Sequence, residues 1–419
     1  MATSSLDSEL ANDDVSEDLV GAPYAVVESD PFVFTSMMQR LGVIGVQAEE
    51  VLSLELIESI SQPYGFILCF KWEKDSYAPE DYLSEEDDTE IPWFAQQLSN
   101  DSCATLSIVN VLMNCTDIEL GPTLSMFKAF TTKMDPTMRG LSIVNSTELR
   151  NVHNSFARPA DLRASLSKIT AETIESGKAQ KKPRGRKSKK AKDEPPDSYH
   201  FLSYVPYRGR VWEMDGLKRA PLECGEIEKD QPWVEAVLPA LRTRIEGFSR
   251  NGSISFTLLA INISSYHQKI EDFELTKREV VFLERRLHNE FEEAWKQTVP
   301  DDLWSSRDRA FAQSWPTLLR PGFGSRSNDA SMRILRLNIG DLRGEWEASV
   351  DRLVAKQLAV DEELRKDTSN HVQNINRTHD YEPFIREYIV RLYQNGFLQD
   401  ILEIDAQGRP RRQSKGKRK

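Results

Sequence analysis

Four side chains of this 419-residue chain carry the functional groups of a thiol hydrolase: Cys103, His200, Asp215 and Gln97. A cysteine thiolate attacks a carbonyl, an imidazole moves the proton, a carboxylate orients the imidazole and an amide N–H stabilises the oxyanion. Taken singly, these residues have structural explanations, such as a buried thiol, a packed strand histidine or an Asp-Gly turn. Together they favour an enzyme with Cys103 as nucleophile, His200 as general acid and base, Asp215 as its orienting group and Gln97 in the oxyanion hole.

The sequence around Cys103 predicts a helix that begins near the thiol. Asn100, Asp101 and Ser102 are residue types that cap helix N-termini, and apolar residues follow at helical spacing from Ile108. In a first turn the unpaired N–H groups and the helix dipole stabilise an anion, so the thiolate is favoured. We therefore expect Cys103 in the first turn of a largely buried helix, where its own N–H can join in holding an oxyanion.

An antiparallel hairpin would bring His200 and Asp215 together. The residues from His200 onward alternate like a strand, Tyr207-Arg208-Gly209 is a polar turn sequence, and Asp215 ends the return strand. A two-residue loop at Tyr207-Arg208 would place His200 directly opposite Asp215, about 5 Å away. A loop centred on Arg208-Gly209 would move the partner by two residues, onto the same face. We expect the carboxylate to accept one imidazole N–H and to leave the other ring nitrogen facing the thiol.

The net charge of −12 is unevenly distributed. Nine basic residues lie between Lys178 and Lys192 and seven between Arg409 and Lys419, with no acidic residue in either segment. Such runs are typical of nuclear import signals and of non-specific nucleic-acid contacts, and Pro183-Arg-Gly-Arg186 also resembles an arm that enters the minor groove of DNA. We expect nuclear and cytoplasmic pools and a salt-sensitive, non-specific nucleic-acid contact through residues 178–192 and 409–419.

The four cysteines show no CxxC or metal-ligand spacing: Cys69, Cys103, Cys115 and Cys224. This usage fits a reducing compartment with one reactive thiol. The first twenty residues lack a basic n-region and an apolar core, and no run of eighteen apolar residues occurs. These features argue against secretion and against a membrane span.

Composition and periodicity divide the chain into five predicted segments. They are a disordered acidic tail (1–24), an α/β domain (25–263) with a long mobile loop inserted at 158–198, a helical hairpin (264–370), a helical tail domain (371–404) and a basic disordered tail (405–419).

The hairpin is predicted from two apolar stripes on long helices, with a break near Pro316 to Asn328. The stripes are Phe273, Val280, Leu283 and Leu287, then Leu342, Trp346, Val350, Leu353, Val360 and Leu364. Such helices can pack on their own domain or hold a partner helix. Tyr381, Phe384, Ile385, Tyr388 and Leu392 follow helical spacing in the tail, where they could be core or contact residues.

Several blocks of the chain resemble the papain-like ubiquitin carboxyl-terminal hydrolases, in particular the longer subgroup with a C-terminal helical extension. The blocks are Val27–Thr35, Gly45–Leu54, Phe70–Trp72, Gln97–Cys103, Ser125–Phe130, Val152–Ala157, His200–Asp215 and Ser255–Ile261, and His379–Ile385 resembles the subgroup's tail. Leu106 departs from the family, whose members often carry a polar or smaller residue there.

The resemblance implies an α/β (α+β), papain-like cysteine hydrolase with a central antiparallel sheet flanked by helices and a C-terminal α-helical extension. It implies a deubiquitinase in which the Cys103 thiolate attacks at the C-terminal glycine of ubiquitin while Gln97 and the Cys103 N–H hold the oxyanion. His200 and Asp215 complete the site, no metal or organic cofactor is needed, and the 158–198 segment crosses over the site and restricts which adducts enter. His153 has no carboxylate strand beside it, so we assign it to structure or substrate contact.

Ubiquitin is the implied substrate partner, and residues 264–404 are the implied site for a proteasome subunit or a chromatin-complex adaptor. The lack of a long central linker favours ubiquitin-dependent protein catabolism at the proteasome, whereas the basic segments favour a histone deubiquitinase on chromatin. A weakly active ubiquitin-binding scaffold is the remaining alternative, but a scaffold has no chemical need for all four site residues.

Overall fold

The N-terminal part of the chain forms one six-stranded antiparallel sheet. A computed structural model describes residues 23–60, 62–71, 91–99, 101–179, 199–249, 256–316, 319–320 and 322–402. The strand order is β1-β6-β2-β3-β4-β5, and every neighbouring pair is antiparallel. The strands are β1 (Val46–Glu50), β2 (Gly65–Lys71), β3 (Tyr199–Tyr207), β4 (Arg210–Met214), β5 (Leu222–Glu226) and β6 (Phe256–Ile263).

Helices cover both faces of this sheet, which is why the central strands β6, β2 and β3 are buried along most of their length. Six of the seven β2 residues are buried, as expected for a strand that is covered on both sides. One core includes residues of α1 (Pro31–Arg40), α2 (Cys103–Leu112) and α5 (Thr147–Asn154); the other includes residues of η1 (Leu54–Ser59) and α7 (Trp233–Ser249). The remaining helices of this part are α3 (Gly121–Thr131), α4 (Pro136–Asn145) and α6 (Pro159–Ala179).

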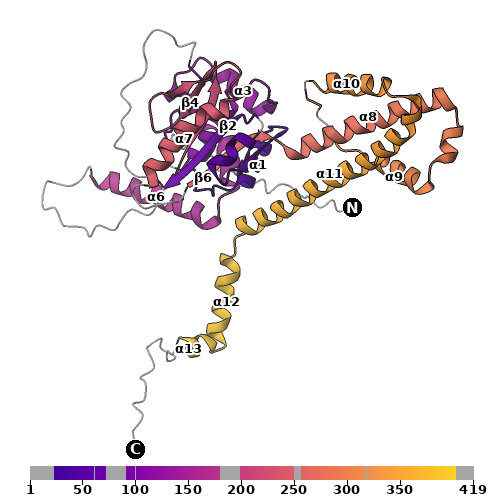
Figure 1. Cartoon of the computed structure of the whole chain (residues 1–419). Helices are drawn as coiled ribbons and strands as arrows, with labels where there is room; N and C mark the ends of the chain where they lie inside the picture. Colours follow the sequence, from indigo (N-terminus) through magenta and orange to yellow (C-terminus); the bar gives the residue numbers. More distant parts are fainter. Residues whose placement is uncertain are drawn as a thin grey trace, which may run out of the picture.

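The C-terminal part is helical and has its own core. Its long helices α8 (Ser265–Phe291) and α11 (Leu342–Thr378) lie side by side, and shorter helices fill the connection between them (Figure 1). The shorter elements are η2 (Ala294–Thr298), α9 (Asp301–Ala312), α10 (Phe323–Leu335) and η3 (Ile339–Asp341). The rings of Trp295, Trp304 and Trp346 pack against one another with centroids 4.9 to 5.4 Å apart. The predicted stripe residues are buried here, except Leu364, which is exposed.

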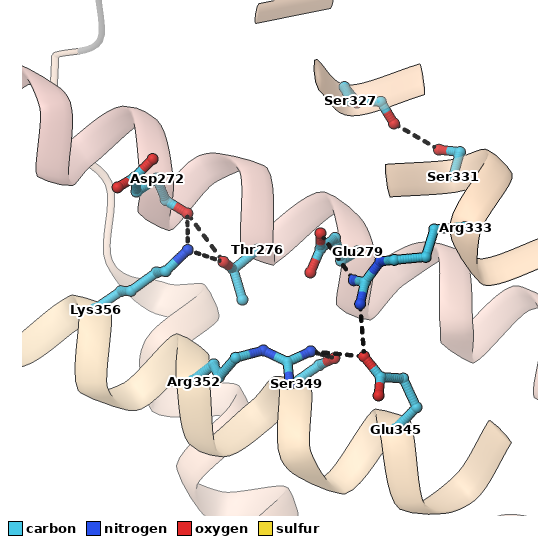
Figure 2. A network of polar contacts seen from close by, with 10 residues as sticks. All are labelled: Asp272, Thr276, Glu279, Ser327, Ser331, Arg333, Glu345, Ser349, Arg352 and Lys356. Atoms are coloured by element: carbon cyan, nitrogen blue, oxygen red, sulfur yellow. Dashed lines mark hydrogen bonds and ion pairs between the residues drawn. The ribbon is translucent and has the colours of Figure 1, made fainter. Parts of the chain in front are cut away.

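Polar contacts set the register of α8 against α10 and α11 (Figure 2). Lys356 Nζ of α11 donates to Thr276 Oγ1 of α8 at 2.7 Å, and Thr276 is buried. Arg333 of α10 joins Glu279 of α8 to Glu345 of α11, at 3.2 and 3.3 Å. These contacts specify one alignment of helices whose apolar stripes alone would permit sliding.

Two groups of contacts attach the helical part to the sheet domain. Where β6 runs into α8, Gln47 Nε2 donates to Ser265 Oγ at 3.0 Å. At the far end of α11, Arg377 pairs with Asp30, the N-cap of α1, at 2.8 Å, and Arg163 of α6 pairs with Asp380 at 3.1 Å. After that point α12 (Glu382–Gln394) and α13 (Phe397–Ile401) extend away from the sheet domain (Figure 1).

Four segment predictions are wrong in part. The first half of the predicted 158–198 loop is helix α6, which begins at Pro159, a favoured first helical residue, and meets no glycine until Gly177. The predicted 370/371 boundary falls inside α11, because neither glycine nor proline occurs from Glu345 to Glu382. The predicted break at 316–328 overlaps α10, which supplies Phe323 and Ile334 to buried positions. Tyr24, placed in the disordered tail, is buried and its hydroxyl donates to Ile143 O at 2.9 Å.

Other predictions lie outside the described residues. They concern the tail up to residue 22, most of the basic segment 178–192, the second half of the inserted segment and the basic tail 405–419. Within the described ranges, no helix combines the length and apolar character that crossing a membrane requires.

Candidate active site

Cys103 is the first residue of α2, as predicted. All ten residues of α2 are buried, and Cys103 is 7% exposed. Ser102 is the N-cap, but its side chain makes no capping bond to the helix; its hydroxyl donates instead to Ser99 O at 2.9 Å. The N–H groups of the first turn therefore point toward the thiol region without a side-chain cap, an arrangement that favours an anion there.

His200 and Asp215 are in contact. Of the two predicted turns the structure adopts Arg208-Gly209, which shifts the register by two residues, instead of the Tyr207-Arg208 turn that would pair them directly. The turn is Arg208-Gly209, both with positive φ (51° and 75°), so Ser203 pairs with Met214 and Asp215 lies just beyond the strand. A turn with two positive φ values matches the twist of the strands, which explains why this loop forms instead of Tyr207-Arg208. His200 Nε2 and Asp215 Oδ1 are nevertheless 2.7 Å apart, and both residues are buried.

The contacts of His200 favour its charged form. Burial lowers the pKa of His200, but its hydrogen bonds and charge interactions with Asp215 and Cys103 outweigh burial and raise the pKa to about 9. Because Asp215 occupies Nε2, Nδ1 is the ring nitrogen available to the thiol. Burial raises the pKa of Asp215, but His200, the Leu217 N–H and Arg244 together bring that pKa below its usual range. The geometry thus suits a thiolate–imidazolium pair oriented by a carboxylate.

A backbone hydrogen bond holds Gln97 next to Gly216, the residue that follows Asp215. The Gln97 N–H donates to Gly216 O at 2.8 Å, and its side-chain Nε2 donates to Ser99 O at 3.1 Å. Its Oε1 is buried and makes no hydrogen bond within the described residues. A carboxamide has two N–H donors, so the second remains for an oxyanion.

Gly216 permits this close packing. A Cβ on Gly216 would lie 2.1 Å from Leu106 Cδ2 and 3.0 Å from Gln97 Cβ. Leu106 is buried in α2, one turn after Cys103. The Leu106 side chain occupies the space that a Cβ on residue 216 would need, so this position requires glycine. This role of Gly216 was not predicted from the sequence.

Gly216→Ala is expected to destabilise the protein by about 1–3 kcal/mol, because added volume in a packed core forces neighbours to move. It should also lower the catalytic rate, since Gln97 would be displaced. Urea unfolding and steady-state kinetics measure both effects. Leu106→Ala alone also costs stability because it leaves a cavity, so the double variant should lose less than the two single variants together. Gly247→Ala, at an exposed helix position with nothing within 4 Å of the added Cβ, should be at least as stable as the wild type. A Gly216→Ala protein with unchanged stability and rate would contradict the close approach.

His153 is a buried structural residue near the nucleophile helix. Its Nδ1 lies 2.8 Å from Thr105 Oγ1 of α2, and its Nε2 lies 2.7 Å from Ala25 O. The carbonyl can only accept, so Nε2 carries the proton and Nδ1 accepts from the hydroxyl. Burial lowers the pKa of His153 to about 4, with the Ala25 hydrogen bond opposing the shift. His153 therefore joins the N-terminal segment to α2 as a neutral group.

This low pKa of His153 predicts a loss of stability in acid. The unfolded chain takes up the proton near pH 6.5 and the folded chain only near pH 4, so the free energy of unfolding should fall as the pH drops between these values. The full effect is about 3 kcal/mol. Urea unfolding of wild type and His153→Gln from pH 7 to 4 measures the difference in slope. The exposed His371→Gln should keep the wild-type slope, and equal slopes for all three proteins would contradict a buried neutral His153.

The loop before Cys103 also faces α6. Burial raises the pKa of Asp101, and the charge of Lys168 on α6 partly opposes the shift. Asp101 has φ +61°, a conformation uncommon for a non-glycine residue.

Among the residues described above, no group of three His, Cys, Asp or Glu side chains could hold a metal ion.

The chain is similar to known ubiquitin carboxyl-terminal hydrolases. Residues 24–246 match the sequence model of ubiquitin carboxyl-terminal hydrolase, family 1. The chain is 35% identical over 252 residues to ubiquitin carboxyl-terminal hydrolase ubh-4 of Caenorhabditis elegans, covering 59% of this chain and 69% of that protein. It is 35% identical to isozyme L5 of Dictyostelium discoideum (57% and 61% of the chains) and 34% identical to BAP1 of Xenopus tropicalis (56% and 33%).

Among solved structures, Trichinella spiralis UCH37 bound to ubiquitin vinyl methyl ester is 29% identical and covers 60% of this chain and 87% of that one, with a TM-score of 0.46. The antiparallel sheet with flanking helices and the Cys103–His200–Asp215 arrangement define the class as a cysteine hydrolase. The chain belongs to the ubiquitin carboxyl-terminal hydrolase family 1 and is a ubiquitin carboxyl-terminal hydrolase. The predicted family, fold class and enzyme class are confirmed.

Proposed function

We propose that this protein is a deubiquitinase that hydrolyses the bond at the C-terminal glycine of ubiquitin in conjugates or chains. The observation that carries the proposal is the 2.7 Å contact between His200 and Asp215 beside a cysteine at the start of a buried helix. Ubiquitin is the partner that occupies this site.

In the proposed reaction the Cys103 thiolate attacks the glycine carbonyl carbon, and the His200 imidazolium gives its proton to the leaving amine. The resulting thioester is attacked by water, whose proton passes to His200, and the ubiquitin carboxylate and free thiolate are released. Asp215 keeps the imidazole oriented through both steps, and Gln97 with the Cys103 N–H holds the oxyanion.

The test uses ubiquitin with a fluorophore attached through an amide to its terminal glycine. The protein should release this fluorophore, and it should not release the same fluorophore from isolated glycine, because recognition requires folded ubiquitin. Absence of cleavage, or equal cleavage of both substrates, would overturn the proposal and leave the ubiquitin-binding scaffold as the alternative.

We further propose that α12 and α13 bind an adaptor on the proteasome, in ubiquitin-dependent catabolism, with a histone deubiquitinase on chromatin as the alternative. None of the α12 residues is buried. Exposed apolar side chains include Phe384 (69%), Tyr388 (55%), Tyr393 (53%), Phe397 (60%) and Ile401 (67%). An apolar surface of this kind is typical of a protein-binding site.

Helix α6 connects this surface to the nucleophile loop. Arg163 of α6 pairs with Asp380 and Glu382 at the start of α12, at 3.1 and 2.9 Å, while Lys168 of the same helix acts on Asp101. An adaptor on α12 would therefore lie next to α6, whose Lys168 acts on the loop before Cys103, and this arrangement supports the proposed regulation by the partner.

Binding to purified proteasomes and hydrolysis of nucleosomes carrying ubiquitinated histone distinguish the two roles. Phe384→Glu/Tyr388→Glu should lose proteasome binding, whereas Met126→Glu, at a 72% exposed position on α3, should keep it. Cleavage of the nucleosome without proteasome binding would favour the chromatin role. The basic segments 178–192 and 409–419 support a nuclear pool beside a cytoplasmic one, and their deletion should reduce nuclear localisation and any non-specific nucleic-acid binding.

A further inference from the structure

A buried polar network continues behind the His200–Asp215 pair. Asp215 Oδ1 faces His200 and accepts the Leu217 N–H at 3.0 Å, while Asp215 Oδ2 lies 3.5 Å from Arg244 Nη2. The same Nη2 is 3.0 Å from Glu213 Oε1, and Tyr204 OH donates to Glu213 Oε2 at 2.7 Å.

The sheet register places these groups together. Tyr204 of β3 and Glu213 of β4 are directly opposed. Glu213 and Asp215 are two positions apart, so they point to the same side of the chain. Helix α7 packs on β4 and contributes apolar residues to the core that it shares with η1. Arg244 extends from α7 to both carboxylates.

Glu213 and Asp215 are 7% and 5% exposed, so neither carboxylate is well hydrated. Two buried carboxylates in one site compete for a proton unless a cation compensates them. Burial raises the pKa of Glu213, with Arg244 and Tyr204 acting against the shift. The charged and titratable groups that act on one or both carboxylates are His200, Tyr204, Cys224, Arg244 and Lys218, and Cys103 acts on His200.

We propose that Arg244 is a positioning residue for the reaction, which holds Oδ2 of Asp215 so that Oδ1 stays directed at His200, and that it balances the buried Glu213 carboxylate. Glu213 and Tyr204 in turn hold the guanidinium in place. This inference rests on the proposed roles of Cys103, His200 and Asp215. Without Arg244, Asp215 and Glu213 would share a proton, and Asp215 would turn away from the imidazole.

The test compares Arg244→Met, Arg244→Lys, Glu213→Gln and Arg244→Met/Glu213→Gln with Arg242→Met, an exposed arginine on the same helix. Two measurements are made from pH 5 to 10: kcat and KM with the ubiquitin amide substrate, and the rate of Cys103 alkylation by iodoacetamide, followed by mass spectrometry. Thermal melting identifies the variants that are folded.

Arg244→Met should lower kcat at least about tenfold with KM little changed, and should move the acid limb of kcat up by about one pH unit. In the double variant part of this loss should be recovered, because the amide introduced by Glu213→Gln can donate to Asp215 Oδ2 and no second carboxylate competes. Arg244→Lys should fall between wild type and Arg244→Met, since it keeps the positive charge but its ammonium does not reproduce the position of the guanidinium Nη2 that contacts both carboxylates. Arg242→Met should behave as wild type.

A folded Arg244→Met with kcat within twofold of wild type would overturn the proposal. So would a loss in Arg244→Met that Glu213→Gln leaves unchanged in kcat and in the acid limb, because that result indicates a purely structural role. If Arg244→Met does not fold, the same criteria apply to Arg244→Lys. If the wild type does not cleave the ubiquitin substrate, the proposed function fails, while the pH profile of Cys103 alkylation still tests Arg244.

Discussion

Replacement of Cys103 by alanine is expected to lower the rate of ubiquitin amide hydrolysis by about four orders of magnitude or more. Without the thiol no thioester forms, and His200 and Asp215 have no nucleophile to serve, so removal of this one group abolishes the combined effect of all three. The measurement is release of the fluorophore from the ubiquitin substrate under saturating conditions.

Cys115→Ala is the matched control for this prediction. Cys115 is also a free thiol, is half-buried, and its Sγ lies 3.3 Å from Val111 O of α2, away from His200. Its removal should leave the rate near that of the wild type. Retained activity in Cys103→Ala, or equal loss in both variants, would contradict the assignment of the nucleophile.

Asp215→Asn is expected to reduce kcat/KM by about 10²- to 10⁴-fold, the range for loss of a charged residue that orients a catalytic histidine. It should also change the pH dependence. Burial lowers the pKa of His200, and the negative charge of Asp215 is a main reason that this pKa reaches about 9. Once the charge is removed the imidazolium loses its proton at a lower pH, so the alkaline limb of kcat/KM should move down by about 1–3 pH units.

A pH–rate profile from pH 5 to 10 checks both effects. Asp308→Asn, at an exposed position of α9, is the control and should leave the alkaline limb unchanged. An unchanged limb in Asp215→Asn would show that the His200–Asp215 contact does not set the protonation of the imidazole.

Local pattern was sufficient for several features of this protein. Capping residue types followed by apolar helical spacing predicted a helix at Cys103, and alternation on either side of a polar turn predicted the hairpin that carries His200 and Asp215. The stripes from Phe273 and from Leu342 predicted the core of the helical part. Each of these signals depends on residues close together in the chain, because helix periodicity, strand alternation and turn chemistry are local properties.

The exact hairpin register was beyond this local information. Two turns were compatible with the sequence, and the structure adopts Arg208-Gly209, so contact between His200 and Asp215 is made past the strand end. The helix α6 within the predicted loop, and the continuation of α11 past residue 370, show the same limit. Helix propensity favours helix in both segments, because α6 has no glycine before Gly177 and α11 has none after Gly344.

The groups that surround the candidate site are brought together by long-range packing. Arg244 comes from a helix on the other side of the sheet from α2. The Leu106 side chain leaves no room for a Cβ on Gly216, and His153 joins Ala25 to Thr105. These residues are distant in sequence, and their types have no local pattern that indicates their partners. Residue type and short spacing were sufficient to predict the reactive groups and the elements that hold them. The charge balance around Asp215 and the exposed apolar face of α12 depend on how distant elements pack, which only the folded chain specifies.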